Sequence, residues 1–154
     1  MGSAHDFDFY VGTWEVTNRR LDKALSGSET WDEFPGTSIA KPLFGGTANF
    51  DEIEFPTRGW SGCTIRLYDQ ARDEWSLHWV SSRRTDIDPP VVGRFGGDGR
   101  GEFFADDTYE GRPIKVRYIW SDLSADRAHW EQAFSPDGGE TWETNWTMDS
   151  TRVR

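Results

Sequence analysis

The fold is decided by three pieces of sequence, IKVRYIW (residues 114–120), AHWEQAF (128–134) and TWETNWTM (141–148). Large apolar residues alternate with polar ones in each piece, as Val116, Tyr118 and Trp120 do in the first. A period of two is typical of half-buried antiparallel strands and not of helices. We therefore expect three consecutive strands that share one aromatic face, with the polar side chains of the other face in solvent.

Turn residues recur about every eight to twelve positions along the chain, a spacing typical of an all-β sandwich or barrel. Examples are Pro35-Gly36, Gly45-Gly46 and Gly96-Gly97-Asp98-Gly99. The strands expected between the turns span residues 9–18, 29–34, 37–43, 47–54, 61–68, 74–81, 91–95, 101–106, 113–120, 127–134 and 142–150. One short helix is expected near Leu21 to Leu25.

The alternation also predicts how neighbouring strands pair, because a shift by one residue turns every side chain to the other face. Across the expected hairpins, apolar residues face apolar ones and polar residues face polar ones in one register. Its opposed pairs are Trp130–Trp146, Gln132–Thr144, Tyr118–Trp130 and Cys63–Trp79. We expect these residues, together with Trp120, to form one inner wall.

Length and composition indicate one domain with a largely aromatic core, because nine Trp, ten Phe and four Tyr occur in 154 residues. The formal net charge of -10 argues against nucleic acid or an anionic membrane surface as partner. The single cysteine, Cys63, cannot form an internal disulfide, which favours a reducing cytoplasm. We expect no export signal and no membrane-spanning segment. Whether the chain forms a homodimer stays open.

The two ends of the chain are expected to meet. Gly12-Thr13-Trp14 lies on the first expected strand, and Arg152 follows the last with the parity of Trp146 and Met148. A guanidinium stacked over an indole is worth about 1 to 2 kcal/mol when partly desolvated. Contact between Arg152 and Trp14 would join the first strand to the last and close a barrel.

These residues resemble the calycin superfamily of lipocalins and fatty-acid-binding proteins, in which a Gly-x-Trp on the first strand packs under an arginine from the end of the barrel. Residues 7–16, 31–34 and 130–146 are similar to a bacterial lipocalin-like family of largely unassigned role. The resemblance implies an all-β fold, a closed antiparallel up-and-down barrel of about 8–10 strands with an internal cavity. The resemblance spans nearly the whole chain and implies no catalytic residues, and residues 1–154 are expected to form a single domain.

A second local motif is the segment SPDGGETW (135–142), which resembles the Asp-box of sialidases and related propellers. Its glycines permit positive φ, and Ser135 and Asp137 can hold backbone amides across the loop. A single copy argues against a propeller, so we expect a structural hairpin.

Candidate polar groups for chemistry are few. His5, His78 and His129 show no metal-ligand spacing, so no metal and no cofactor is expected. Gln132 and Thr144 interrupt the aromatic face, where each must bond the other, a water or a ligand.

Over residues 29–54, the alternation does not show which carboxylates point into the barrel. One parity turns Glu33 and Glu52 inward, and the other turns Asp32 and Asp51 inward. A carboxyl among indoles has a raised pKa and could act as a general acid or base.

Two functions fit the predicted cavity. The first is binding of a small hydrophobic, aromatic or polycyclic molecule by Cys63, Trp79, Tyr118, Trp120, Trp130, Gln132, Thr144 and Trp146. The second is a cofactor-independent isomerase or cyclase that uses shape, stacking and one of Glu33, Asp51 or Tyr118. The long connection that carries Arg83-Arg84 and Pro89-Pro90 is expected at the mouth. A barrel filled by its own side chains would instead favour a structural module.

Overall fold

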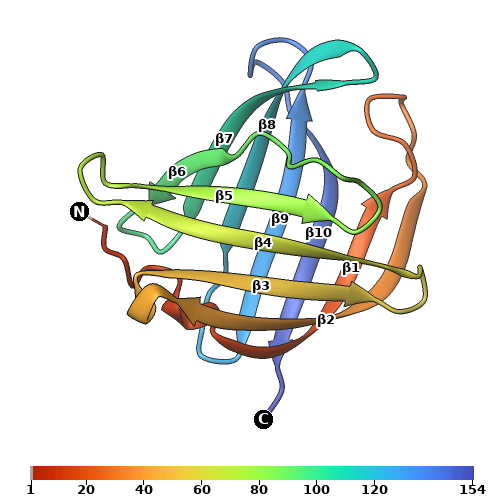
Figure 1. Ribbon diagram of the computed structural model, residues 1–154. Coiled ribbons are helices and arrows are strands. Elements are labelled where there is room, and N and C mark those ends of the chain that lie inside the picture. The colour runs from red at the N-terminus through yellow and green to blue at the C-terminus, as the bar shows by residue number, and fades with distance from the viewer. Residues whose placement is uncertain (1) are drawn as a thin grey trace.

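The computed structural model describes residues 2–154 as ten antiparallel strands with almost no helix (Figure 1). The strands are β1 (Gly12–Leu21), β2 (Trp31–Leu43), β3 (Ala48–Phe55), β4 (Trp60–Asp69), β5 (Glu74–Ser81), β6 (Val91–Phe95), β7 (Gly101–Tyr109), β8 (Arg112–Ser121), β9 (Arg127–Ser135) and β10 (Glu143–Arg152). Two short 3-10 helices are η1 (Asp8–Tyr10) and η2 (Phe44–Gly46). No helix within residues 2–154 is long and apolar enough to span a membrane.

Each strand pairs with the next along the chain, and β1 also pairs with β10, so the sheet closes into a barrel. In Figure 1, β2 to β5 cross in front of β8 to β10 at a steep angle, as strands tilted around a barrel do. The shortest pairing joins β5 to β6 over residues 75–77 and 91–93. The predicted closed antiparallel barrel is therefore confirmed.

The turn predicted at Pro35-Gly36 is wrong, because residues 29–34 and 37–43 belong to one strand, β2. A Cβ on Gly36 would lie 3.1 Å from Asn18 Nδ2 and 3.3 Å from Ile53 Cδ1. This glycine therefore marks a close approach inside a strand and not a turn.

The short helix expected at Leu21 to Leu25 is also wrong. Strand β1 continues to Leu21, and a turn follows in which Leu25 has a φ of 55°. This left-handed backbone conformation is incompatible with a right-handed helix.

The pairing of β8 with β9 is shifted by two residues from the expected register. Trp120 lies opposite Trp130, and Tyr118 lies opposite Gln132. Because the shift is even, the inner face keeps the expected residues.

The pairing of β9 with β10 contains an irregularity between Thr144 and Trp146. Trp146 consequently lies opposite Gln132, so the expected Gln132–Thr144 and Trp130–Trp146 pairs are wrong. The extra residue, Asn145, is buried, although the alternation of residues along β10 predicts that it faces solvent.

The pairing of β4 with β5 is shifted by one residue, which turns β4 over. Arg66 lies opposite Leu77 and is 2% exposed, whereas Leu67 is 38% exposed. Cys63 therefore faces the outside of the barrel, and its expected place in the wall opposite Trp79 is wrong. A buried arginine is tolerated here because its charge partner comes from β3.

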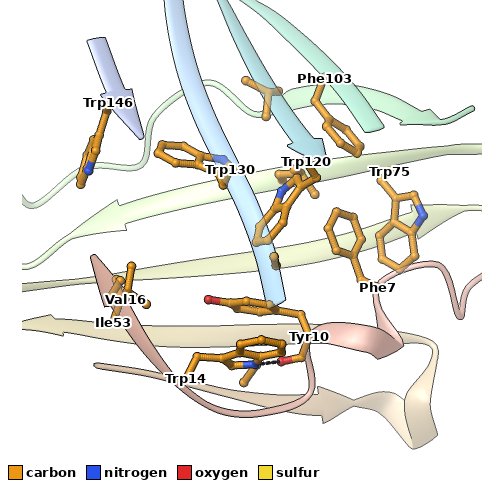
Figure 2. Packing of buried hydrophobic residues seen from close by; sticks show 14 of the residues in the cluster. Phe7, Tyr10, Trp14, Val16, Ile53, Trp75, Phe103, Trp120, Trp130 and Trp146 are labelled. Carbon is orange, nitrogen blue, oxygen red and sulfur yellow. Dashed lines mark hydrogen bonds between the residues drawn. The ribbon is translucent and has the colours of Figure 1, made fainter. Parts of the chain in front are cut away.

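The N-terminal segment fills one end of the barrel (Figure 2). Phe7 is fully buried, and its ring centroid lies 5.0 Å from that of Trp75 and 5.7 Å from that of Trp120. Tyr10 stacks on Trp14 at 4.9 Å, and Trp14 Nε1 donates a hydrogen bond to the Tyr10 carbonyl. Open space lies beyond these contacts, toward residues 83–89.

Candidate ligand-binding cavity

A cavity of about 550 Å³ lies between the aromatic cluster around Phe7 and Tyr10 and the loop 82–90. Six of the residues predicted to bind a ligand line it, namely Trp79, Tyr118, Trp120, Trp130, Gln132 and Trp146. Cys63 and Thr144 do not line it, because β4 is turned over and β10 is irregular before Trp146. The structure thus brings together residues from β5, β8, β9 and β10.

The apolar wall is a set of aromatic rings in edge-to-face contact. Trp146 meets Trp130 at 5.7 Å and 85°, and Trp79 at 6.0 Å and 88°. Tyr118 meets Trp130 at 5.1 Å and 75°. Such contacts are the preferred geometry of aromatic pairs, so the wall is stabilised in its own shape before any ligand enters.

Trp60 also lines the cavity, although it is not among the residues predicted to bind a ligand. Its ring lies 6.1 Å from that of Trp146 and 6.4 Å from that of Trp79. Trp60 shares the parity of Thr64 and Arg66, so the correct register of β4 would have identified it.

Gln132 has a polar partner inside the barrel, but the partner is Asn145 and not Thr144. Gln132 Nε2 donates to Asn145 Oδ1 at 2.8 Å. The irregularity of β10 turns Asn145 inward and supplies this acceptor.

A buried ion pair forms part of the cavity floor. Arg66 Nη2 donates to Asp51 Oδ1 at 2.5 Å, and Arg66 Nη1 donates to Asn49 Oδ1 at 3.1 Å. The hydroxyl of Ser38 donates to the second Asp51 oxygen at 3.0 Å. Asp51 and Arg66 are 5% and 2% exposed, so two opposite charges neutralise each other out of water.

Of the four carboxylates left open by the sequence, only Asp51 faces the cavity. Glu33 and Glu52 are exposed, and Glu33 lies 4.0 Å from Arg19 on the outer surface. Asp32 has the inward parity but lies exposed at the start of β2, where it binds Arg58. Glu33, one of the candidates for catalysis, therefore lies outside the cavity.

Two tyrosine hydroxyls border the cavity. Burial raises the pKa of Tyr118, and the charges of Asp88 and Asp107 add to this effect. Burial, followed by the charge of Asp51, raises the pKa of Tyr10 to about 12. Both hydroxyls are protonated at neutral pH, so they can donate hydrogen bonds but do not serve as bases.

The mouth of the cavity is bordered by the loop 82–90, as the sequence predicts. Arg84 Nε donates to Asp86 at 2.9 Å, and Arg84 Nη1 lies 2.6 Å from Asp88. Val80 and Ile87 form an isolated β-bridge across the start of this loop. These contacts give the mouth loop a defined shape.

The remaining predicted features lie away from the cavity. The Asp-box is a structural hairpin, in which Gly139 N donates to Ser135 Oγ at 2.8 Å and Thr141 N donates to Asp137 at 2.9 Å. His129 bonds Asp149 on the neighbouring strand β10 and Glu131 on its own strand β9. Within residues 2–154, no group of three or more His, Cys, Asp or Glu side chains is arranged to hold a metal ion.

The chain is similar to known proteins in its fold and not in its sequence. No protein-family model matches the chain, and no curated protein matches it. A solved structure that it resembles is the S-type phycobiliprotein lyase CPES from Guillardia theta, with a TM-score of 0.60 and 11% sequence identity. The match covers 99% of this chain and 94% of that chain. The likeness therefore extends over the whole barrel and supports a lipocalin-like fold.

Proposed function

We propose that this protein binds a small hydrophobic molecule, aromatic or polycyclic, inside the barrel. The observation that carries the proposal is the cavity of about 550 Å³ behind a wall of indole rings. Ligand sites commonly occupy about 300 to 1,000 Å³ and combine apolar walls with a few polar groups. A barrel with a purely structural role would be filled by its own side chains, because protein interiors pack densely.

The wall favours a flat aromatic ligand. Five indoles line the cavity, those of Trp60, Trp79, Trp120, Trp130 and Trp146. An aromatic pair gains about 0.5 to 1.5 kcal/mol beyond its buried area. The single cysteine of the chain favours the cytoplasm as the place where this ligand is met.

The test is a titration with N-phenyl-1-naphthylamine, a neutral probe whose fluorescence rises in apolar surroundings. We expect one probe per barrel and energy transfer from tryptophan. Trp130→Leu should weaken binding about three- to tenfold, the equivalent of one lost aromatic contact. Trp142→Leu is the matched control, because Trp142 lies outside the cavity, stacked against Arg117.

The proposal fails if the wild-type protein binds none of a panel of neutral aromatic probes. It also fails if Trp130→Leu and Trp142→Leu lower the affinity equally, because the probe would then bind the outer surface. Circular dichroism of each variant checks that the barrel is intact.

Asp51 favours a second function, a cofactor-independent isomerase or cyclase. Its carboxylate borders the cavity beside the Arg66 guanidinium, where it could exchange a proton with a bound molecule. The likeness to a lyase is compatible with such a role, although one fold supports many functions. Asp51→Asn and Tyr118→Phe should each lower kcat for any bound molecule that is converted. Turnover that survives both substitutions would exclude acid–base catalysis by these groups.

A further inference from the structure

Two arginines stand together at the mouth of the cavity. Arg20, at the end of β1, has its Cζ 4.3 Å from the ring centroid of Trp146 and 5.7 Å from that of Trp60. Arg83, on the loop 82–90, has its Cζ 3.7 Å from the Trp60 centroid. Both side chains line the cavity, Arg20 half-buried and Arg83 exposed.

Neither guanidinium has an acidic partner. Within residues 2–154, no carboxylate lies within 4.0 Å of the Arg20 or Arg83 side chain, and neither side chain donates a hydrogen bond. The neighbouring Arg84, by contrast, is held by Asp86 and Asp88. The chain has 27 acidic residues against 17 basic ones, so two adjacent unpaired arginines stand out.

Keeping these two charges together is unfavourable in the absence of an anion. Burial lowers the pKa of Arg20, and the positive charge of Arg83 lowers it further. The indoles stabilise the faces of the guanidinium planes and hold them in place. The N–H donors around each plane are not used by this stacking, and their planar fork matches an oxyanion.

We propose that Arg20 and Arg83 together bind an oxyanion of the ligand, a carboxylate in the first instance, at the mouth of the cavity. This inference rests on the proposed function, since the aromatic body of the same ligand would lie among the indoles below. The ligand class is thereby narrowed from aromatic molecules to aromatic acids.

The carboxylates that line the cavity leave Arg20 and Arg83 free. Asp86 and Asp88 share the single charge of Arg84, and Asp107 has no ion pair among the described residues. At the floor, Asp51 neutralises Arg66. A second anion at the floor would therefore lack a free cation, so the charged end of the ligand belongs at the mouth.

The experiment compares two probes that share one skeleton. 1-Anilinonaphthalene-8-sulfonate carries an oxyanion, and N-phenyl-1-naphthylamine lacks it. Arg20→Gln and Arg83→Gln should each weaken binding of the sulfonate at least about fivefold and change binding of the neutral probe less than about twofold. Rising salt should weaken sulfonate binding by the wild type and have less effect on the variants.

Arg127→Gln is the matched control, because it removes the same charge from an exposed position at the other end of the barrel. It should leave the affinity for both probes unchanged. Thermal unfolding of all variants verifies that each is folded.

The outcomes separate the two proposals. If the sulfonate binds the Arg20 and Arg83 variants as tightly as the wild type while the neutral probe also binds, the oxyanion site is wrong and the proposed function stands. An equal effect of Arg127→Gln would also overturn the site, since net charge alone would then explain the loss. If the wild type binds neither probe, both proposals fail.

Discussion

Arg152 stacks on Trp14 and joins the last strand of the barrel to the first. Its Cζ lies 4.3 Å from the indole centroid, and its guanidinium donates to the carbonyls of Phe9 at 2.6 Å, Val11 at 2.7 Å and Ala125 at 2.7 Å. One side chain therefore connects β10 to η1, to the start of β1 and to the β8–β9 connection.

Arg152→Ala should lower the free energy of unfolding by about 2 to 4 kcal/mol, because three charge-assisted hydrogen bonds and a stacking contact are lost together. Urea unfolding measures the change. Arg154→Ala is the control, since Arg154 is exposed and pairs with the exposed Asp126. It should change stability by less than about 1 kcal/mol. Equal effects of the two substitutions would contradict a closing role for Arg152.

Gly12→Ala should destabilise the same closure. Gly12 has a φ of 132°, and a Cβ there would lie 2.4 Å from Arg152 Nη1. The strained backbone and the displaced guanidinium should together cost about 1 to 3 kcal/mol. Gly97→Ala is the control, because nothing lies within 4 Å of its added Cβ. Thermal unfolding distinguishes the two, and a tolerated Gly12→Ala would show that Arg152 can bind elsewhere.

Asp51 and Arg66 should behave as a coupled pair in a double-mutant cycle. Asp51→Leu leaves the Arg66 charge buried without its partner and should cost about 3 to 5 kcal/mol. The double variant Asp51→Leu/Arg66→Met should recover much of this loss, because no buried charge is left. Chemical unfolding of the four proteins gives the coupling energy. Strictly additive losses would mean that the 2.5 Å contact contributes no net stabilisation.

His129 should make stability depend on pH. Burial alone would lower the pKa of His129, but its hydrogen bonds to Asp149 and Glu131 outweigh burial and raise that pKa. Protonated His129 therefore stabilises the fold below the unfolded pKa of about 6.5, and this stabilisation is lost as pH rises through the higher folded pKa.

The His129 contribution can be measured by following the unfolding free energy from pH 5.5 to pH 8.5. His129→Gln should abolish the part of the decline that belongs to this residue. His5→Gln is the control, because His5 is exposed and pairs with the exposed Asp8. Parallel curves for the wild type and His129→Gln would contradict the ion-pair assignment.

The aromatic face of β8, β9 and β10 was accessible to sequence reasoning because local alternation is a property of neighbouring residues. Trp120, Trp130 and Trp146 point inward even though their partners across the strands differ from those expected. A two-residue shift keeps each side chain on its face, so the inner wall tolerates this error.

Local alternation predicts the wrong inner face for β4, where the apolar residues Cys63, Ile65 and Leu67 alternate as an inner face should. The strand is turned over because Arg66 finds Asp51 and Asn49 on β3 and aromatic rings around its guanidinium. No local pattern contains that information, since the partners lie 15 and 17 positions away along the chain. A buried charge is predictable only together with the group that compensates it.

Three features are predictable from the sequence alone: the strand character of the chain, the inward face of β8 and β9, and the closing contact between Trp14 and Arg152. These follow from side-chain period and from two residues whose chemistry is complementary. Only the tertiary structure decided that Trp60 joins the wall, that Asp51 and Arg66 lie beneath it, and that Arg20 and Arg83 meet at the mouth. Those features depend on strand register and loop position, which are set by contacts between distant parts of the chain and not by the local alternation of residues.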